Sequence, residues 1–186
     1  MLEVNAKQVK DFVIAGHGNV ETVKSMLEAN PELLNAAHEW RTGDLETALQ
    51  AASHVGNREI ALYLLSRGAT LRITTAAMLG DVAALNKFLA RDSSLIHSSG
   101  AHGIPLLVHA VMSDDAALVS SLISRGAVSG ASMALNIATD IGNLAVVRVL
   151  LTQAQPDPHW KNMKGKSALE LAAGHFELLK LLEGTT

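Results

Sequence analysis

Histidine is the residue type in this sequence with the broadest chemical capacity, because an imidazole can accept a proton or bind a metal ion. The chain has eight histidines and no cysteine, so thiolate metal sites, disulfides and cysteine nucleophiles are excluded. His97, His102 and His109 are separated by 5 and 7 residues, which places them on different elements and matches no usual zinc-ligand spacing. His109 lies inside an apolar stretch, which favours a packed, hydrogen-bonded residue over a ligand. We therefore expect no metal site.

The acidic residues and the known catalytic motifs give no reason to expect an enzyme. Asp114 and Asp115 are adjacent, so on a regular helix they cannot face one substrate as a general acid and base. They suit a helix N-terminus, where carboxylates cap free amides and interact favourably with the helix dipole. The sequence contains no glycine-rich phosphate loop, no Gly-x-Ser-x-Gly elbow and no His-Glu-x-x-His. We expect a protein without catalytic residues and without cofactors.

The bulk composition indicates a folded protein that binds neither nucleic acid nor membranes. Of its 186 residues 48% are hydrophobic, which is enough to bury a substantial core. Its 15 basic and 18 acidic residues give a net charge of -3, so no broad positive field attracts a phosphate backbone. No apolar signal region follows the charges between Met1 and Lys10, and no apolar run approaches the roughly 18 to 20 residues that span a bilayer. We expect a cytoplasmic location.

The elements that must position any functional residue follow from an internal repeat of about 31 residues. In each copy an Ala-rich apolar stretch precedes a turn dipeptide and an amphipathic run with apolar residues at i, i+3, i+4 and i+7, which is helical spacing. Glycine permits the positive φ of a tight turn, and the Asn or Asp after it can cap the next helix. Stacked antiparallel helical hairpins are the expected result. The turn dipeptides are Gly18-Asn19, Gly56-Asn57, Gly80-Asp81, Ser113-Asp114, Gly142-Asn143 and Gly174-His175.

Several segments resemble those of ankyrin repeats. Residues 47–53 and 167–173 are similar to the Thr-Pro-Leu-His-x-Ala signature of that family, and residues 104–110 form a looser third copy. The Arg-Gly-Ala ending of such a repeat occurs at 67–69 and 125–127. The resemblance covers nearly the whole chain and implies an all-α ankyrin-repeat solenoid of stacked antiparallel helix pairs with short finger loops. It implies one domain, 1–186, with approximate repeats 5–37, 38–70, 71–99, 100–128, 129–157 and 158–186.

The sequence also departs from the family pattern. From Gly68 to Gly80 there are only 12 residues, too few for a β-finger plus a helix, so the third repeat must enter its first helix almost directly. The fifth repeat is short in the same way. His17 and His175 stand beside turn glycines, where the resemblance implies a local hydrogen-bonding role.

In ankyrin repeat proteins, partners usually lie against the concave face formed by the fingers and the first helices. Aligning the repeats on their turn residues places an apolar strip along this face, made of Val55, Met78, Leu79, Val111, Met112 and Ile141. Exposed apolar patches tend to mark binding surfaces, and Met is an adaptable contact residue. The alternative is that these side chains pack against the next repeat. Both alternatives stay open for Met78 and Met112, which are expected to be the more outward of the two residues that precede each turn.

Both tryptophans, Trp40 and Trp160, fall in finger segments, next to Arg41 and Lys161. A Trp beside a cation suits a contact hot spot, and the alternative is that each Trp folds back as a lid over its own finger. The residues expected to bind a partner are Trp40, Arg41, Glu46, His54, Val55, Met78, Val111, Met112, Asp140, Trp160, Lys164 and Lys166.

These features predict a non-catalytic scaffold that binds a partner protein on its concave face. The scaffold would act as a monomer through a rigid surface that loses little freedom on binding. The alternative is a regulatory or assembly subunit of an oligomer, in which the same apolar strip is buried between copies. Sedimentation separates the two hypotheses, because a concentration-independent monomer is incompatible with the second.

Overall fold

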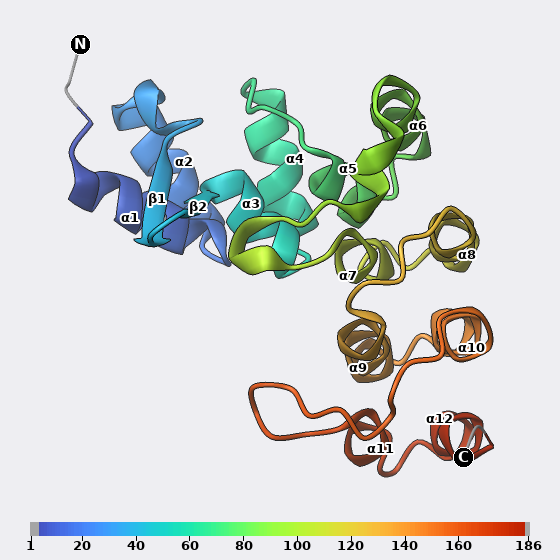
Figure 1. Cartoon of the computed structure of the whole chain (residues 1–186). Coiled ribbons are helices and arrows are strands. Elements are labelled where there is room, and N and C mark those ends of the chain that lie inside the picture. The colour runs from blue at the N-terminus through green and yellow to red at the C-terminus, as the bar shows by residue number, and fades with distance from the viewer. Residues whose placement is uncertain (1–3, 185–186) are drawn as a thin grey trace.

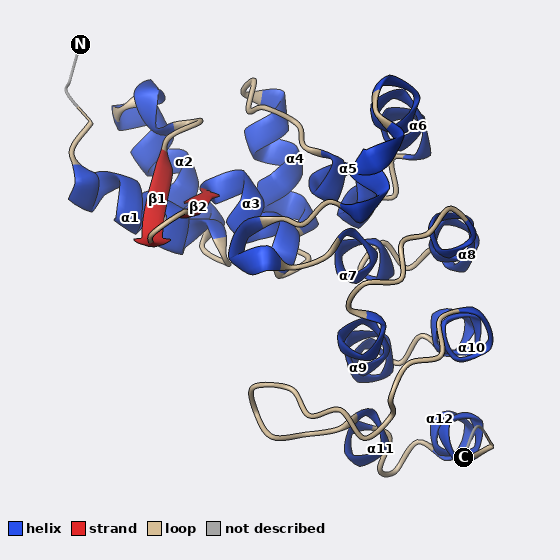
Figure 2. Ribbon diagram, viewed as in Figure 1, coloured by secondary structure: helices blue, strands red, loops and turns tan. Residues whose placement is uncertain are grey.

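The chain folds into a stack of helix pairs (Figures 1 and 2). The computed structural model of the protein describes residues 4–184. In each pair an inner helix is followed by an outer helix that packs back against it. Six pairs lie within the described range, which confirms the expected all-α solenoid. The inner and outer helices are Ala6–Gly16 and Val20–Ala29 (α1, α2), Ala48–His54 and Arg58–Ser66 (α3, α4), Ile73–Leu79 and Val82–Arg91 (α5, α6), Leu106–Val111 and Ala116–Ser124 (α7, α8), Ala131–Ile141 and Leu144–Gln153 (α9, α10), and Ala168–Leu171 and Phe176–Glu183 (α11, α12).

Five outer helices begin directly after the turn because a side chain in the turn caps them. In α4, Oδ1 of Asn57 accepts a hydrogen bond from the backbone N–H of Ile60 at 3.1 Å. Such a bond satisfies one of the amides that have no partner inside the helix. The predicted capping is confirmed for Asn19, Asn57, Asp81 and Asn143.

The turn before α8 corrects one expectation. Asp115 alone caps this helix, accepting from the backbone N–H of Leu118 at 3.0 Å. Asp114 instead takes the place of the turn glycine, with a φ of 64°, and its side chain accepts a hydrogen bond from Asn143. The left-handed region is open to Asp at modest cost, so the turn survives without glycine.

The inner helices approach one another closely because their contact positions carry small side chains. An added Cβ on Gly16 would lie only 2.6 Å from the carbonyl oxygen of Ala48 in the next inner helix. Two groups of buried side chains result, one centred on α1 to α4 and the other running from α5 to α12. The fully buried alanines of the inner helices are Ala48, Ala51, Ala52, Ala76, Ala77, Ala110, Ala134 and Ala138.

Loops before three of the inner helices form fingers. The first is a hairpin of two antiparallel strands, Ala37–Arg41 (β1) and Asp44–Thr47 (β2). The second contains the short 3-10 helix Ala101–Gly103 (η3), and the third is the loop 154–167. Two more 3-10 turns, Pro31–Leu33 (η1) and Ser93–His97 (η2), follow the outer helices α2 and α6.

The third helix pair has no finger, as expected from its short connection. Residues 67–72 alone join α4 to α5. The second finger therefore packs directly against the first, through η3 and β2. Figure 1 shows that the stack changes direction after this point, so that α1–α4 and α7–α12 form two rows and the loop 154–167 projects towards the inside of the bend. None of the helices in residues 4–184 is long and apolar enough to cross a membrane.

Candidate functional site

The residues expected to bind a partner divide into exposed and buried groups. Trp40, at 38%, and Val55, at 47%, are exposed, whereas Glu46, Met78 and Val111 are at most 1% exposed. The prediction is corrected for these last three residues, because a partner cannot contact them in this conformation. Arg41, Asp140, Lys164 and Lys166 are also exposed, and Met112 and Trp160 are half-buried. The His54 side chain is mostly buried.

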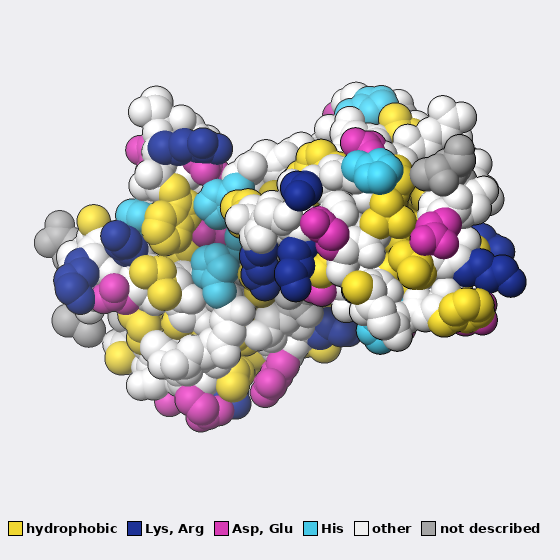
Figure 3. Space-filling model, turned by 90° about the horizontal axis from the view of Figure 1, so that it is seen from below, with side chains coloured by type: hydrophobic (Ala, Val, Ile, Leu, Met, Phe, Trp, Pro, Cys, Tyr) yellow, Lys and Arg dark blue, Asp and Glu magenta, His cyan; other side chains and the backbone are white. Residues whose placement is uncertain are grey.

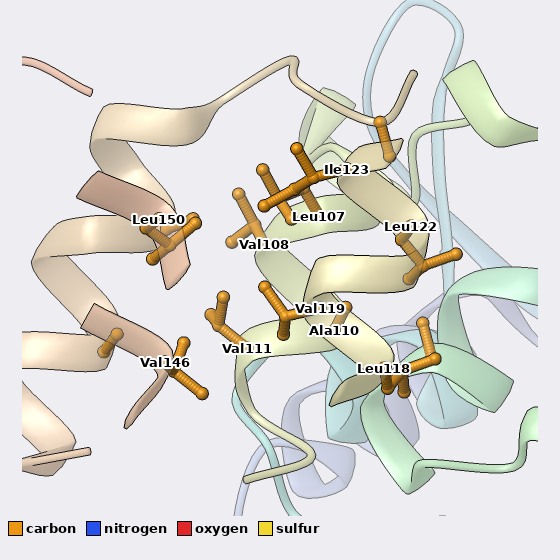
Figure 4. Close-up of a cluster of buried hydrophobic side chains, with 14 of the residues drawn as sticks. Leu107, Val108, Ala110, Val111, Leu118, Val119, Leu122, Ile123, Val146 and Leu150 are labelled. Atoms are coloured by element: carbon orange, nitrogen blue, oxygen red, sulfur yellow. The ribbon is translucent and has the colours of Figure 1, made fainter. Parts of the chain in front are cut away.

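The predicted apolar strip is interrupted because its central members pack inward. The main-chain carbonyls at the end of α5 accept hydrogen bonds from the guanidinium of Arg58, at 3.2 Å for Met78 and 3.1 Å for Leu79. Arg58 thus covers this end of the helix, while the Met78 side chain joins the N-terminal core. Figure 4 shows Val111 among side chains of α8 and α10. Of the six strip residues, Val55 and Ile141 are exposed.

Beside the first finger, three imidazoles converge on one buried carboxylate. Oε1 of Glu46 lies 3.3 Å from Nε2 of His54 and 3.8 Å from Nε2 of His17. Its Oε2 lies 3.4 Å from Nε2 of His102. We call His17, Glu46, His54 and His102 the histidine-carboxylate cluster. It joins the ends of α1 and α3 to both neighbouring fingers. Figure 3 shows one face of the molecule, with several histidines close together in its left half.

Further hydrogen bonds orient two of these imidazoles. Nδ1 of His17 donates to the carbonyl oxygen of Val13 at 3.1 Å, which is the local role implied by its place beside the turn. Nδ1 of His102 donates to Oδ2 of Asp44 at 2.9 Å. A neutral imidazole that donates through Nδ1 keeps a lone pair on Nε2. The Nε2 atoms of both rings face the Glu46 carboxylate.

Asp44 holds His102 in an unusual backbone conformation. Its Oδ1 accepts from the backbone N–H of His102 at 2.8 Å, and His102 has a φ of 59°. A residue other than glycine in this left-handed region of backbone conformation is strained, and the surrounding contacts must offset that strain. The hydrogen bonds from the His102 side chain and backbone lower the pKa of the Asp44 carboxyl, which stays ionised and keeps the imidazole in place.

Trp40 closes one side of the cluster. Its indole Nε1 donates to Oε2 of Glu46 at 2.6 Å, and its ring packs edge-on against His38 with centroids 4.6 Å apart. The ammonium of Lys10 lies 5.9 Å from the ring centroid. These contacts favour a lid over the finger, although the remaining exposed part of the ring is still open to a partner.

The electrostatics of the cluster favour a cationic ligand. Burial, reinforced by His17 and His102, lowers the pKa of His54 to about 4, so this imidazole is uncharged at neutral pH. Glu46 has no Lys or Arg partner within residues 4–184. Oε1 of Glu46 and Nε2 of His54 are buried without a hydrogen-bond partner. These two atoms are thus both available to a cation.

Spacing along the chain did not reveal this cluster, because its members come from separate helix pairs. Of the three histidines compared for ligand spacing, His102 belongs to the cluster. His97 is exposed, and His109 is buried with its Nδ1 donating to the carbonyl oxygen of Ser53, as expected for a packed residue. One signal was present in the sequence. His17 and His54 occupy the two positions before the turn in consecutive repeats, and stacked repeats bring such positions side by side.

The last finger holds its exposed side chains on a fixed backbone. Asn136 of α9 donates to the carbonyl oxygen of Lys166 at 3.0 Å and accepts from the Asn162 side chain at 2.9 Å. The Asn162 side chain in turn accepts from the backbone N–H of Lys164 at 2.9 Å. Met163 at the tip is fully exposed.

These features define a solenoid of helical hairpins in which each unit packs against its neighbours. Residues 44–76 match the family model of the ankyrin repeat. The crystal structure of an ankyrin repeat domain from Acinetobacter baumannii AYE is similar to this chain, with a TM-score of 0.53 and 23% sequence identity over 94% of this chain and 97% of that one. No curated protein matches the chain. The chain therefore has the ankyrin-repeat fold, and the resemblance noted in the sequence is confirmed.

Proposed function

We propose that the chain is a non-catalytic scaffold that binds a partner protein with its fingers and the adjoining ends of its inner helices, as a cytoplasmic monomer. Ankyrin repeats generally mediate protein-protein interaction. The observation that supports this proposal is the display of apolar and cationic side chains on fingers whose backbones are fixed by internal hydrogen bonds. A surface ordered before binding loses little conformational entropy on association.

The first and last fingers offer different contacts. Arg41 at the tip of the hairpin has a side chain that is 76% exposed, and it borders a surface hollow of about 420 Å³ between the hairpin and η3. The last finger carries Met163, Lys164 and Lys166, all exposed. An apolar side chain next to two ammonium groups suits a partner segment with an apolar residue beside carboxylates.

Affinity capture from the native host with matched variants tests this proposal. The first variant, Val55→Glu with Ile141→Glu, changes exposed positions at the ends of inner helices, and the second, Lys164→Glu with Lys166→Glu, reverses the charge of the last finger. The control is Leu62→Glu, at a 53% exposed position on the outer helix α4. A protein recovered by the wild type and the control but lost with either variant supports binding on the inner side. Loss with Leu62→Glu alone would place the partner on the outer helices and contradict the proposal.

Sedimentation velocity tests the monomeric state separately. A sedimentation coefficient that is independent of concentration supports a monomer. A coefficient that rises with concentration in the wild type and not in Val55→Glu with Ile141→Glu would support self-association through the inner side instead.

A further inference from the structure

The histidine-carboxylate cluster has the geometry of a site for one metal ion. His17, Glu46 and His54 each offer one ligand atom, and these three atoms lie within 4.8 Å of one another. Zinc bonds such atoms at about 2.0–2.2 Å, so two ligands of a tetrahedral site are about 3.3 Å apart. Oε1 of Glu46 lies 3.3 Å from Nε2 of His54 and 3.8 Å from Nε2 of His17. The His17 nitrogen is thus about 0.5 Å farther from Oε1 of Glu46 than the spacing of a tetrahedral zinc site.

The same distances are too long for hydrogen-bonded ion pairs that would otherwise balance the charge of Glu46. Charge-assisted N–H···O bonds measure about 2.7–2.9 Å. The Glu46 side chain is fully buried, and a buried carboxylate without a cation is costly. The His54 side chain is 10% exposed, and neither its Nε2 nor Oε1 of Glu46 has a hydrogen-bond partner. One bound cation would satisfy both atoms together.

The surroundings resemble the outer shell of a metal site. Metal-binding histidines usually donate their other ring N–H to a carboxylate or a backbone carbonyl, which fixes the ring and increases its basicity. His102 donates to the Asp44 carboxylate and His17 to the Val13 carbonyl. Nε2 of His102 lies 3.4 Å from Oε2 of Glu46, so His102 stands beside the three-ligand set.

We propose that His17, Glu46 and His54 bind one divalent transition-metal ion, best matched by Zn²⁺, and that His102 closes the site as a fourth ligand. Imidazole and carboxylate ligands suit zinc, whereas Mg²⁺ and Ca²⁺ favour oxygen ligands throughout. With four protein ligands the ion is structural and clamps both fingers to the ends of α1 and α3. The proposal departs from the expectation of no metal site, which rested on separations along the chain.

Zinc titration of the chelator-treated full chain by calorimetry tests the proposal. The wild type should bind one Zn²⁺ from ZnCl₂, and MgCl₂ should give no heat of binding at the same concentrations. His17→Gln and Glu46→Gln should each weaken zinc binding at least about 100-fold, because loss of an outer-shell partner alone costs about 10–100-fold. The matched control is His175→Gln, which removes the exposed histidine beside the turn of the last helix pair and should bind as the wild type does.

Two further measurements separate ligation from folding. Asp44→Asn keeps all four ligands and should weaken zinc binding about 10–100-fold if His102 is one of them. Co²⁺ bound to the wild type should show the strong visible absorption of a tetrahedral site. No zinc binding by the wild type, or equal affinity in His17→Gln and His175→Gln, would overturn the proposal, and unchanged affinity in Asp44→Asn would remove His102 from the ligand set. If Glu46→Gln does not fold, His17→Gln decides, since the His17 side chain is 33% exposed.

Discussion

Acidification should destabilise the protein through His109 in α7. This side chain is 1% exposed, and burial lowers its pKa from 6.5 to about 4. Between these two values the unfolded chain binds a proton at His109 that the folded chain does not bind. The free energy of unfolding therefore falls as the pH falls through this window, by about 3 kcal/mol in total. Above the window the contribution of the neutral imidazole is fully present.

Urea unfolding of the wild type and His109→Gln, followed by circular dichroism, isolates this effect. The Gln amide can still donate to the Ser53 carbonyl but does not titrate. Between about pH 7.5 and about pH 5 the difference in unfolding free energy between the two proteins should shift by about 2 kcal/mol in favour of the variant. His159→Gln, at an exposed position of the last finger, should follow the wild type. Parallel pH curves for the wild type and His109→Gln would refute the reasoning.

Two further substitution pairs test the packing. Met78→Ala should lower the unfolding free energy by about 2–5 kcal/mol because Met78 is fully buried, whereas Val55→Ala, at a 47% exposed position, should change it by less than about 0.5 kcal/mol. Equal urea midpoints for this pair would contradict the burial of Met78. Gly16→Ala should cost about 1–3 kcal/mol, because its methyl would lie 2.6 Å from the Ala48 carbonyl oxygen, while Gly18→Ala, with nothing within 4 Å, should be nearly neutral. Thermal melting checks the second pair, and identical melting temperatures would show that α1 and α3 can move apart.

The parts of the fold that depend on short stretches of sequence were predictable. The outer helices begin at turn residues such as Asn57, and this capping depends on residues three apart. The absence of a finger before the third helix pair followed from the distance between Gly68 and Gly80, since a chain of that length cannot form both a hairpin and a helix.

Whether each side chain is buried or exposed could not be predicted from short stretches of sequence. Met78 and Val55 both precede a turn, yet the first is buried and the second exposed. The difference depends on how the next helix pair covers each position, which involves residues far along the chain. The histidine-carboxylate cluster was missed for the same reason, because His102 approaches Glu46 through tertiary packing.

The absence of a finger before the third helix pair also changes how stability is shared along the molecule. A repeat solenoid behaves as a one-dimensional array in which each unit is coupled to its nearest neighbours. Here Asp44, in the finger before the second helix pair, binds His102, in the finger before the fourth pair and 58 positions later. This contact couples next-nearest neighbours in the stack. The units enclosed by this link should open together, whereas the last two pairs lie beyond it and can open from the C-terminal end. The short connection before α5 thus lets two repeats that are not neighbours in the stack contact each other directly, so this part of the molecule does not behave as a simple linear array.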